Sequence, residues 1–265
     1  MEGAKDAYDC RIQDLFSGEG FELAVSIDCE GTNFDRDMDA NMDYLEAFLG
    51  RATDAGVATL LFVTPPYAAK LAERGLAGRL PREYRVIYGL HIHPENLPAE
   101  IAAELPFLRP DEEFIAGYGY EEQARIIGLS YAYLVERGVA PLQIYRGGCF
   151  SMNDDTARAL LERTDIRWES HNPYREHYSA RSAAFASVPV YALARDEELR
   201  LEFFTLDKLK AMLEGAFAAK AKALAITHSY MLNPKDFHYA RDGIAESVHE
   251  RLQALIELRD RLAAR

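Results

Sequence analysis

Two histidines one residue apart, His91 and His93, end the strand-like run 85–93. Alternate residues of a strand point to the same face, so both imidazoles can converge on one point. Neutral imidazole is a common metal ligand, and two on one face supply half of a tetrahedral site. The alternative is a pair of surface histidines beside the turn at Pro94, and the His-x-His pattern alone does not exclude it.

An acidic pair, Asp28 and Glu30, ends a second apolar run, 23–27, in the same way. The run is short and rich in β-forming residues at its end, which favours a buried strand. Carboxylates are costly to bury unpaired, so two of them at the end of a core strand need cations, donors or water. Acids at strand ends also cap turns, but the histidine pair makes a metal site the favoured interpretation.

Two further apolar runs end in a basic residue. Arg146 follows the run 142–145 and precedes a Gly-Gly pair, where we expect the backbone to turn sharply and leave the guanidinium free. Such a guanidinium would hold a carboxylate ionised through a bidentate pair. His228 follows the run 223–227, and beside a metal and carboxylates it would serve as a general acid. The alternatives are a surface arginine and a structural histidine.

These residues require a fold that brings four strand ends together. Besides the strands ending at Ile27 and His93, we expect strands at 57–63, 142–145, 166–168, 188–193 and 223–227, and helices at 41–55, 68–74, 121–137, 154–163 (N-cap Asn153), 206–222 and 244–262. Repeated βα units predict a parallel sheet covered by helices. Polar residues at several strand ends favour a barrel, and the glycine-rich motifs of nucleotide-binding folds are absent.

Composition narrows the possible partners and location. The chain has 265 residues and a net charge of −13, which makes nucleic acid an unfavourable partner and an anionic membrane surface equally so. The sequence has no run of 18 apolar residues, which membrane insertion would require, and we find no signal-peptide pattern at the N-terminus. The cysteines, Cys10, Cys29 and Cys149, form no disulfide framework. We therefore expect a cytoplasmic protein.

Four short motifs follow one another in the order found in polysaccharide deacetylases. They are Ser-Ile-Asp-Cys-Glu-Gly (26–31), Gly-Leu-His-Ile-His-Pro (89–94), Tyr-Arg-Gly-Gly (145–148) and Ile-Thr-His-Ser (226–229). Through these motifs the chain resembles carbohydrate esterase family four, the group with the NodB-like homology domain, over about residues 21–232. The resemblance implies an α/β fold of the irregular (β/α)7 TIM-like barrel type. We expect one domain over 1–265, with an N-terminal extension (1–20) and a closing helix (243–265).

The resemblance also implies a role for each polar residue at the strand ends. Asp28 would be the catalytic base, and the metal ligands would be Glu30, His91 and His93. Arg146 would orient the base, and His228 would be the catalytic acid.

The motifs depart from the family pattern in two places. The first motif of the family commonly has adjacent aspartates, whereas Cys29 separates the two acids here, and the family spaces its two histidines four apart rather than two. Asp28 and Glu30 could therefore exchange roles, and Glu95 is a further candidate ligand.

The implied chemistry is the hydrolysis of an amide by metal-activated water. A divalent cation, with Zn²⁺ the first choice and Co²⁺ or Ni²⁺ the alternatives, would acidify the water and polarise the carbonyl. The expected activity is that of a deacetylase in carbohydrate metabolism, acting on an N-acetyl or other N-acyl group of an amino sugar, a glycan or a related small amide. The alternatives are deformylation, opening of a cyclic amide, or a non-catalytic carbohydrate-binding homologue.

Overall fold

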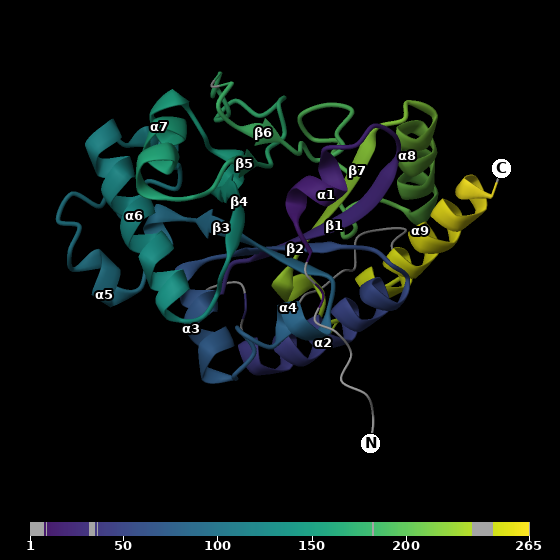
Figure 1. Ribbon diagram of the computed structural model, residues 1–265, viewed down its shortest axis with the longest axis horizontal. Coiled ribbons are helices and arrows are strands. Elements are labelled where there is room, and N and C mark those ends of the chain that lie inside the picture. Colours follow the sequence, from purple (N-terminus) through teal and green to yellow (C-terminus); the bar gives the residue numbers. More distant parts are fainter. Residues whose placement is uncertain are drawn as a thin grey trace.

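A parallel sheet of seven strands, curled into a half-barrel, forms the centre of the part of the chain that the structure describes (Figure 1). The structure, a computed structural model, describes residues 8, 10–31, 35, 37–181, 183–234 and 246–264. The strand order is β6-β5-β4-β3-β2-β1-β7. The strands are β1 (Glu22–Cys29), β2 (Thr59–Val63), β3 (Val86–Ile92), β4 (Leu142–Gly147), β5 (Trp168–Glu169), β6 (Ala186–Ser187) and β7 (Lys222–His228). The predicted fold class, an α/β barrel of the irregular (β/α)7 type in a single domain, is confirmed.

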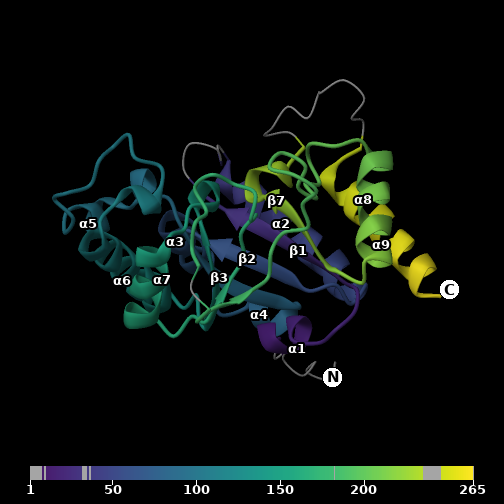
Figure 2. The same cartoon turned by 90° about the horizontal axis from the view of Figure 1, so that it is seen from above.

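Helices surround the sheet, with α6 and α7 at the β3–β4 side and α8 and α9 beside β7 (Figures 1 and 2). The helices are α1 (Ile12–Phe16), α2 (Met38–Asp54), α3 (Pro65–Glu73), α4 (Leu80–Glu83), α5 (Ala99–Ala102), α6 (Tyr120–Glu136), α7 (Asp154–Arg163), α8 (Leu206–Ala218) and α9 (Val248–Ala263). Short 3₁₀ turns are η1 (Pro94–Asn96), η2 (Ile115–Gly117), η3 (Gly148–Phe150) and η4 (Ser229–Met231). None of the described helices is long and apolar enough to cross a membrane.

Several helices begin where the sequence provides a cap. Thr64 accepts a hydrogen bond from the backbone N–H of Tyr67, and the two prolines that follow it suit the first turn of α3. The predicted N-cap Asn153 accepts a hydrogen bond of 2.9 Å from the backbone N–H of Thr156 at the start of α7. These caps start α3 directly after β2, and α7 shortly after the turn that follows Arg146.

The two faces of the sheet bury two separate apolar cores, because neighbouring residues of a strand point to opposite faces. The larger core lies between the sheet and the helices and includes Leu23, Val25 and Ile27 of β1. The smaller core lies on the inner face and is made of Ile12, Ala24, Leu60, Phe62, Ile87, Ile144, Phe150, Val188, Val190, Leu224 and Ile226. Residues of β1 with even numbers therefore face the interior of the half-barrel.

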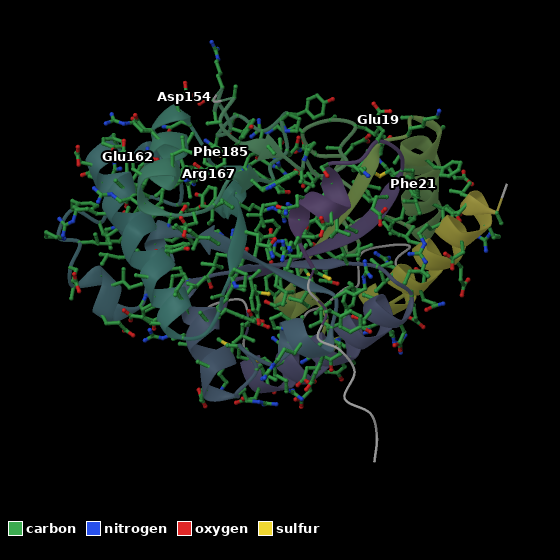
Figure 3. All side chains as sticks on the ribbon, viewed as in Figure 1. Glu19, Phe21, Asp154, Glu162, Arg167 and Phe185 are labelled. Carbon is green, nitrogen blue, oxygen red and sulfur yellow. The ribbon has the colours of Figure 1, made fainter. Side chains whose placement is uncertain are left out.

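The described part of the expected N-terminal extension belongs to the fold. The backbone N–H of Ile12 donates to Oε1 of Gln143 over 2.9 Å, and Nε2 of Gln143 donates to the carbonyl of Cys10 over 3.0 Å. Phe21, just before β1, packs edge-on against Phe217 of α8, with ring centroids 5.2 Å apart (Figure 3). Helix α1 thus contributes Ile12 to the inner core, and this short helix was not expected from the sequence.

Three predicted elements differ from the observed ones. The strand expected at 188–193 is wrong: β6 ends at Ser187, and Val188 and Val190 are apolar because they fill the inner core. The helix expected at 206–222 ends at Ala218, since Lys220 has a φ of 52° and Lys222 already belongs to β7. The strand expected at 166–168 starts only at Trp168.

Other boundaries were closer. The closing helix expected from residue 244 includes positions outside the described residues, and its described part is Val248–Ala263. The helix expected at 68–74 starts at Pro65. The short helices α4 and α5 were not expected, since segments of 4 residues carry almost no periodic signal.

Candidate metal and catalytic site

The polar residues at the four strand ends continue the inner rows of the sheet. Strand pairing places Asp28 opposite His228 across β1 and β7, and His91 opposite Arg146 across β3 and β4. All four are buried, with exposed fractions of 7% or less. Directly below them the same rows hold apolar residues such as Ile226, so the site lies on top of the inner core.

Glu30, His91 and His93 form a cluster that could hold a metal ion. One ligand atom from each of the three lies within 4.8 Å of the others. The two imidazoles meet edge to face, with centroids 4.9 Å apart and planes at 83°. Nε2 of His93 lies 3.6 Å from Oε1 of Glu30, too far for a hydrogen bond but close enough for both atoms to bind one cation.

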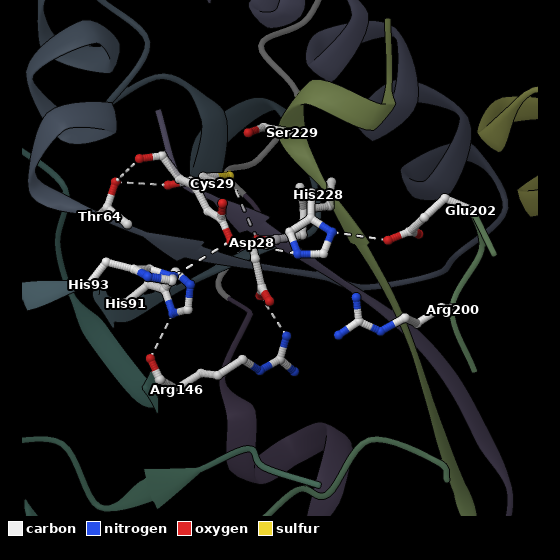
Figure 4. Close-up of polar contacts among 12 residues, drawn as sticks. Asp28, Cys29, Thr64, His91, His93, Arg146, Arg200, Glu202, His228 and Ser229 are labelled. Atoms are coloured by element: carbon white, nitrogen blue, oxygen red, sulfur yellow. Dashed lines mark hydrogen bonds and ion pairs between the residues drawn. The ribbon is translucent and has the colours of Figure 1, made fainter. Parts of the chain in front are cut away.

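The second ring nitrogen of each histidine has a hydrogen-bond partner on the side away from Glu30, and Figure 4 shows this contact for His91. Nδ1 of His91 donates to the carbonyl of Arg146 over 2.8 Å, and Nδ1 of His93 donates to Oε1 of Glu95 over 3.0 Å. Both Nε2 atoms are buried and have no hydrogen-bond partner among the described residues. Buried polar atoms normally have partners, so two bare nitrogens beside a carboxylate fit a divalent cation with nitrogen and oxygen ligands. Glu95, the further candidate ligand, contacts the far side of His93.

The Glu30 carboxylate keeps its charge despite burial. Burial raises its pKa, but the close contact with His93 and the positive charges of the nearby histidines outweigh burial and bring the pKa below its usual value. Thr64 fixes the backbone there, because its hydroxyl donates to the carbonyls of Cys29 and Glu30 over 3.0 and 2.7 Å. Thr64, the N-cap residue of α3, is thereby joined to the backbone of the candidate ligand Glu30.

Asp28 is paired with Arg146, as the sequence predicted that a carboxylate would be. Nη1 of Arg146 donates to Oδ1 of Asp28 over 2.6 Å and to the hydroxyl of Ser26 over 3.0 Å. Its other nitrogens donate to the carbonyl and hydroxyl of Ser170, and the guanidinium lies 3.9 Å from the ring centre of Phe62. Burial raises the pKa of Asp28, but the charges of Arg146, His91 and His228, together with the hydrogen bond from Arg146, outweigh burial, and the pKa is about 2. Asp28 is therefore a carboxylate that is ionised at neutral pH.

His228 faces the same space from the other side. Its Nδ1 donates to Oε1 of Glu202 over 3.0 Å, and its Nε2 lies 3.6 Å from Oε1 of Glu30. Tyr230 stacks on the imidazole with centroids 5.1 Å apart. Burial lowers the pKa of His228, but the hydrogen bond to Glu202 and the charges of both glutamates outweigh it and raise the pKa above its usual value. The imidazole is thus suited to carry a proton at Nε2.

The structure brings together all six residues that the sequence singled out, and it adds two that the sequence did not. Ser170 fixes Arg146 from 24 positions away, and Glu202 fixes His228 from 26 positions away. The sequence did contain a signal for Glu202: the segment 199–203 alternates apolar and charged residues, which is typical of a strand. This segment runs beside β7, where the backbone N–H of Leu201 donates to the carbonyl of Ile226 over 3.0 Å.

The glycine pair after Arg146 serves a different purpose from the one expected. Left-handed backbone is found instead at Cys149 and Phe150, with φ of 52° and 59°. A Cβ on Gly147 would lie 2.0 Å from the carbonyl oxygen of Ser151, and one on Gly148 would lie 2.7 Å from two atoms of the His93 ring. The glycines therefore permit close contacts and do not make the turn.

Four aromatic side chains in the segments 118–120 and 168–174 are of a type that can stack on a sugar, and three of them are engaged in other contacts. Tyr118 is buried at 3% exposure, and the hydroxyl of Tyr120 contacts Glu162. Trp168 packs against the inner core, whereas Tyr174 is 55% exposed. Of these four, Tyr174 alone is free to contact a ligand.

Comparisons with known proteins identify the fold and leave the reaction open. No family model and no curated protein matches the sequence. A proposed polysaccharide deacetylase from Mycobacterium smegmatis superimposes with a TM-score of 0.56, 15% identity, and coverage of 93% of this chain and 85% of that one. A family 4 carbohydrate esterase from Streptomyces lividans, solved with acetate, gives a TM-score of 0.50, 8% identity, and coverage of 90% and 87%.

A third similar structure is a family 4 pseudoenzyme from Bacillus anthracis. It gives a TM-score of 0.51 and 9% identity, and the alignment covers 90% of this chain and 60% of that one. A mutant of a family 4 pseudoenzyme with restored enzymatic activity aligns equally well, with a TM-score of 0.50. The chain therefore has the fold of the family 4 carbohydrate esterases, the NodB-like fold that the sequence motifs predicted, and this fold accommodates both active and inactive proteins.

Proposed function

We propose that this chain is a metal-dependent hydrolase that removes an N-acetyl or other N-acyl group from an amino sugar, a glycan or a related small amide. The observation that carries the proposal is that a candidate metal cluster and a candidate base and acid lie in one buried space. Ligand atoms of Glu30, His91 and His93 lie within 4.8 Å of one another, and Asp28 and His228, which are paired across β1 and β7, lie beside them (Figure 4). A base, an acid and a cation site are what amide hydrolysis requires.

The proposed reaction adds water to the acyl carbon, breaks the C–N bond, and releases a carboxylic acid and an amine. A divalent cation held by Glu30, His91 and His93 would supply a Lewis acid that acidifies water and polarises the acyl oxygen. Asp28, kept ionised by Arg146, accepts the proton of the attacking water. His228 donates the proton from Nε2 to the departing nitrogen, while Glu202 holds its Nδ1.

Zinc is the proposed metal, with cobalt or nickel as alternatives, because the donor set is one carboxylate and two imidazoles. Acetyl is the proposed acyl group because the esterase from Streptomyces lividans was solved with acetate, the acid that deacetylation releases. Hydrolysis of other C–N bonds at the same site, such as deformylation, would use the same residues. Only the substrates that the protein hydrolyses distinguish such a reaction from deacetylation.

A non-catalytic role is the second candidate, since one structure of this fold is described as a pseudoenzyme. It is disfavoured here because the base, the acid and all three candidate ligands occur together, and none is replaced by an inert residue. A protein that only binds carbohydrate has no need to hold Asp28 ionised with a buried guanidinium.

The proposal is tested by metal analysis combined with amine release. Protein purified without chelator should contain about one equivalent of divalent metal and should release amine from N-acetylated sugars. Chelation should abolish turnover, and added Zn²⁺ should restore it. Binding of N-acetylated sugars without amine release by the metal-loaded protein would establish the non-catalytic alternative.

A further inference from the structure

Arg200 brings a second guanidinium to the site, and the proposed reaction does not use it. Arg200 lies in the segment 199–203 beside β7 and forms a β-bridge with Ile226. Ile226 precedes His228 by two positions in β7. Figure 4 shows the guanidinium of Arg200 pointing toward Asp28 and Arg146 from the side of His228 and Glu202. Its side chain is 17% exposed, so part of it remains accessible.

One nitrogen of Arg200 fixes the orientation of the whole group. Nε donates to Oε2 of Glu198, whose other oxygen accepts hydrogen bonds from Arg175 over 2.7 Å and Asn172 over 2.8 Å. Glu198 is 1% exposed and is itself anchored by these partners. Arg200 is therefore held at its Nε edge, which leaves the outer edge with its two Nη groups directed into the site.

The two Nη groups have no hydrogen bond or ion pair with any residue that the structure describes. Each neighbouring carboxylate already has a partner: Asp28 has Arg146, Glu198 has Arg175, and Glu202 has His228. In addition, the buried Oε2 of Glu202 has no hydrogen-bond partner among the described residues. The Nη groups of Arg200 and one oxygen of Glu202 thus remain without hydrogen bonds to described residues, on the side of the site where His228 lies.

An anion matches this arrangement better than a neutral group. The outer edge of a guanidinium offers two parallel N–H bonds, which fit the two oxygens of a carboxylate or phosphate. Arg200 lies on the side of His228, where the amine would leave, and away from the cluster of Glu30, His91 and His93, where the acyl oxygen would lie. The anionic group would therefore belong to the amine-bearing part of the substrate.

We propose that the Nη groups of Arg200 form an anion subsite that binds a carboxylate or phosphate on the amine-bearing part of the N-acyl substrate. This inference rests on the proposed function for the identity of the substrate. The net charge of −13 does not exclude such a subsite, because the attraction of Arg200 is local and solvent screens the more distant surface charges.

The test compares matched substrates with the zinc-loaded enzyme. The panel is N-acetylglucosamine and its analogues with a C6 carboxylate, a 6-phosphate or a 1-phosphate. We expect kcat/KM for at least one anionic analogue to exceed that for the neutral sugar by roughly 10- to 100-fold, the range of one hydrogen-bonded charge pair. The analogue with the largest ratio identifies the anion, carboxylate or phosphate, and its position.

Variants assign the preference to Arg200. Arg200→Gln should reduce the ratio of anionic to neutral kcat/KM to about one, and Arg200→Lys, which keeps the charge but not the paired N–H groups, should retain part of it. Arg158→Gln is the matched control, because this exposed arginine of α7 pairs with Glu162 away from the site and its loss should preserve the ratio. Thermal unfolding checks that each variant is folded; if the Gln variant is not, the Lys variant must still show a reduced ratio.

Calorimetric binding of the corresponding free amines separates this proposal from the proposed function. If no amide is hydrolysed but the wild type binds the anionic amine more tightly than glucosamine, and Arg200→Gln does not, the subsite stands and the deacetylase proposal fails. If amides are hydrolysed with no preference for any anionic analogue, the subsite is wrong and the deacetylase proposal stands. An equal loss on every substrate in Arg200→Gln would also overturn the subsite, because Arg200 would then act on the reacting group.

Discussion

The backbone of Gly148 lies directly against the imidazole of His93. A Cβ at position 148 would stand 2.7 Å from Cε1 and Nδ1 of that ring, closer than real Cβ atoms approach their neighbours. The hydrogen bond from Nδ1 of His93 to Glu95, 3.0 Å long, also holds the ring. The position of the proposed ligand therefore depends on the absence of a side chain in the turn after β4.

The first prediction follows from this contact. Gly148→Ala should displace the His93 ring and weaken zinc binding by about 10- to 100-fold, the usual effect of disturbing a group that orients a metal ligand. Gly78→Ala is the control, since a Cβ there has nothing within 4 Å. Zinc affinity is measured by competition with a chromophoric chelator. Equal affinities for the two variants would show that the turn yields without moving His93.

The second prediction concerns the metal cluster itself. Zn²⁺ should stabilise the wild type by about 2.7 kcal/mol at roughly 100 times its Kd, because the cluster of Glu30, His91 and His93 exists only in the folded chain. His93→Ala should lose most of this stabilisation, and His177→Ala, outside the cluster, should keep it. Thermal unfolding with and without zinc provides the measurement. A full zinc shift in His93→Ala would exclude that residue as a ligand.

The third prediction separates the base from the carboxylate ligand. Asp28→Asn should abolish turnover and retain metal, because Asp28 is bonded to Arg146 and lies outside the trio. Glu30→Gln should lose both. Metal content and amine release are measured on the same samples. The reverse pattern would mean that the two acids have exchanged roles.

The fourth prediction tests His228 as the acid. An amine leaves poorly unless it is protonated, whereas an activated phenolate leaves unaided, so His228→Ala should depress amide hydrolysis by roughly 10²- to 10⁴-fold and affect an aryl ester much less. Glu202→Gln should also depress amide hydrolysis more than ester hydrolysis, but to a smaller extent, because it weakens the hydrogen-bond partner of Nδ1 of His228. Metal content should not change. Equal losses on amide and ester would assign His228 to a role other than proton donation.

The fifth prediction concerns the buried pair of Asp28 and Arg146. Arg146→Met leaves the Asp28 carboxylate, 5% exposed, without its cation and should cost about 3–5 kcal/mol of unfolding free energy. Asp28→Asn combined with Arg146→Met should recover part of that loss, because no buried charge then remains unpaired. Denaturant unfolding of the metal-free single and double variants measures the coupling. A double variant as unstable as the sum of the single ones would show that the pair is not coupled.

The residues at the strand ends could be predicted because two signals coincide there. An apolar run such as 223–227 shows where a buried strand lies, and the first polar residue after it, His228, shows where the strand reaches the site. The same reasoning located Asp28, His91 and Arg146, and the parallel fold brought them together.

The supporting residues were harder to predict because their roles depend on contacts between distant segments. Ser170 has no local pattern that would connect it with Arg146, and the connection exists only because β5 lies beside β4. Val190 shows the opposite failure: its apolar side chain suggested a strand, but it fills the inner core from a loop. An apolar pattern in the sequence indicates that side chains are buried. It does not show whether the segment is paired in the sheet or packs against the core from a loop.

The alternation of side chains along β1 has a consequence for how this sequence can vary. Cys29 belongs to the core under the helices, while Asp28 and Glu30 on either side of it belong to the site. Insertion or deletion of one residue between Ala24 and Asp28 would turn both carboxylates toward the helices and direct the thiol inward. Homologous sequences should therefore exchange one apolar residue for another along the core positions of β1, while the number of residues between its start and the first carboxylate stays constant.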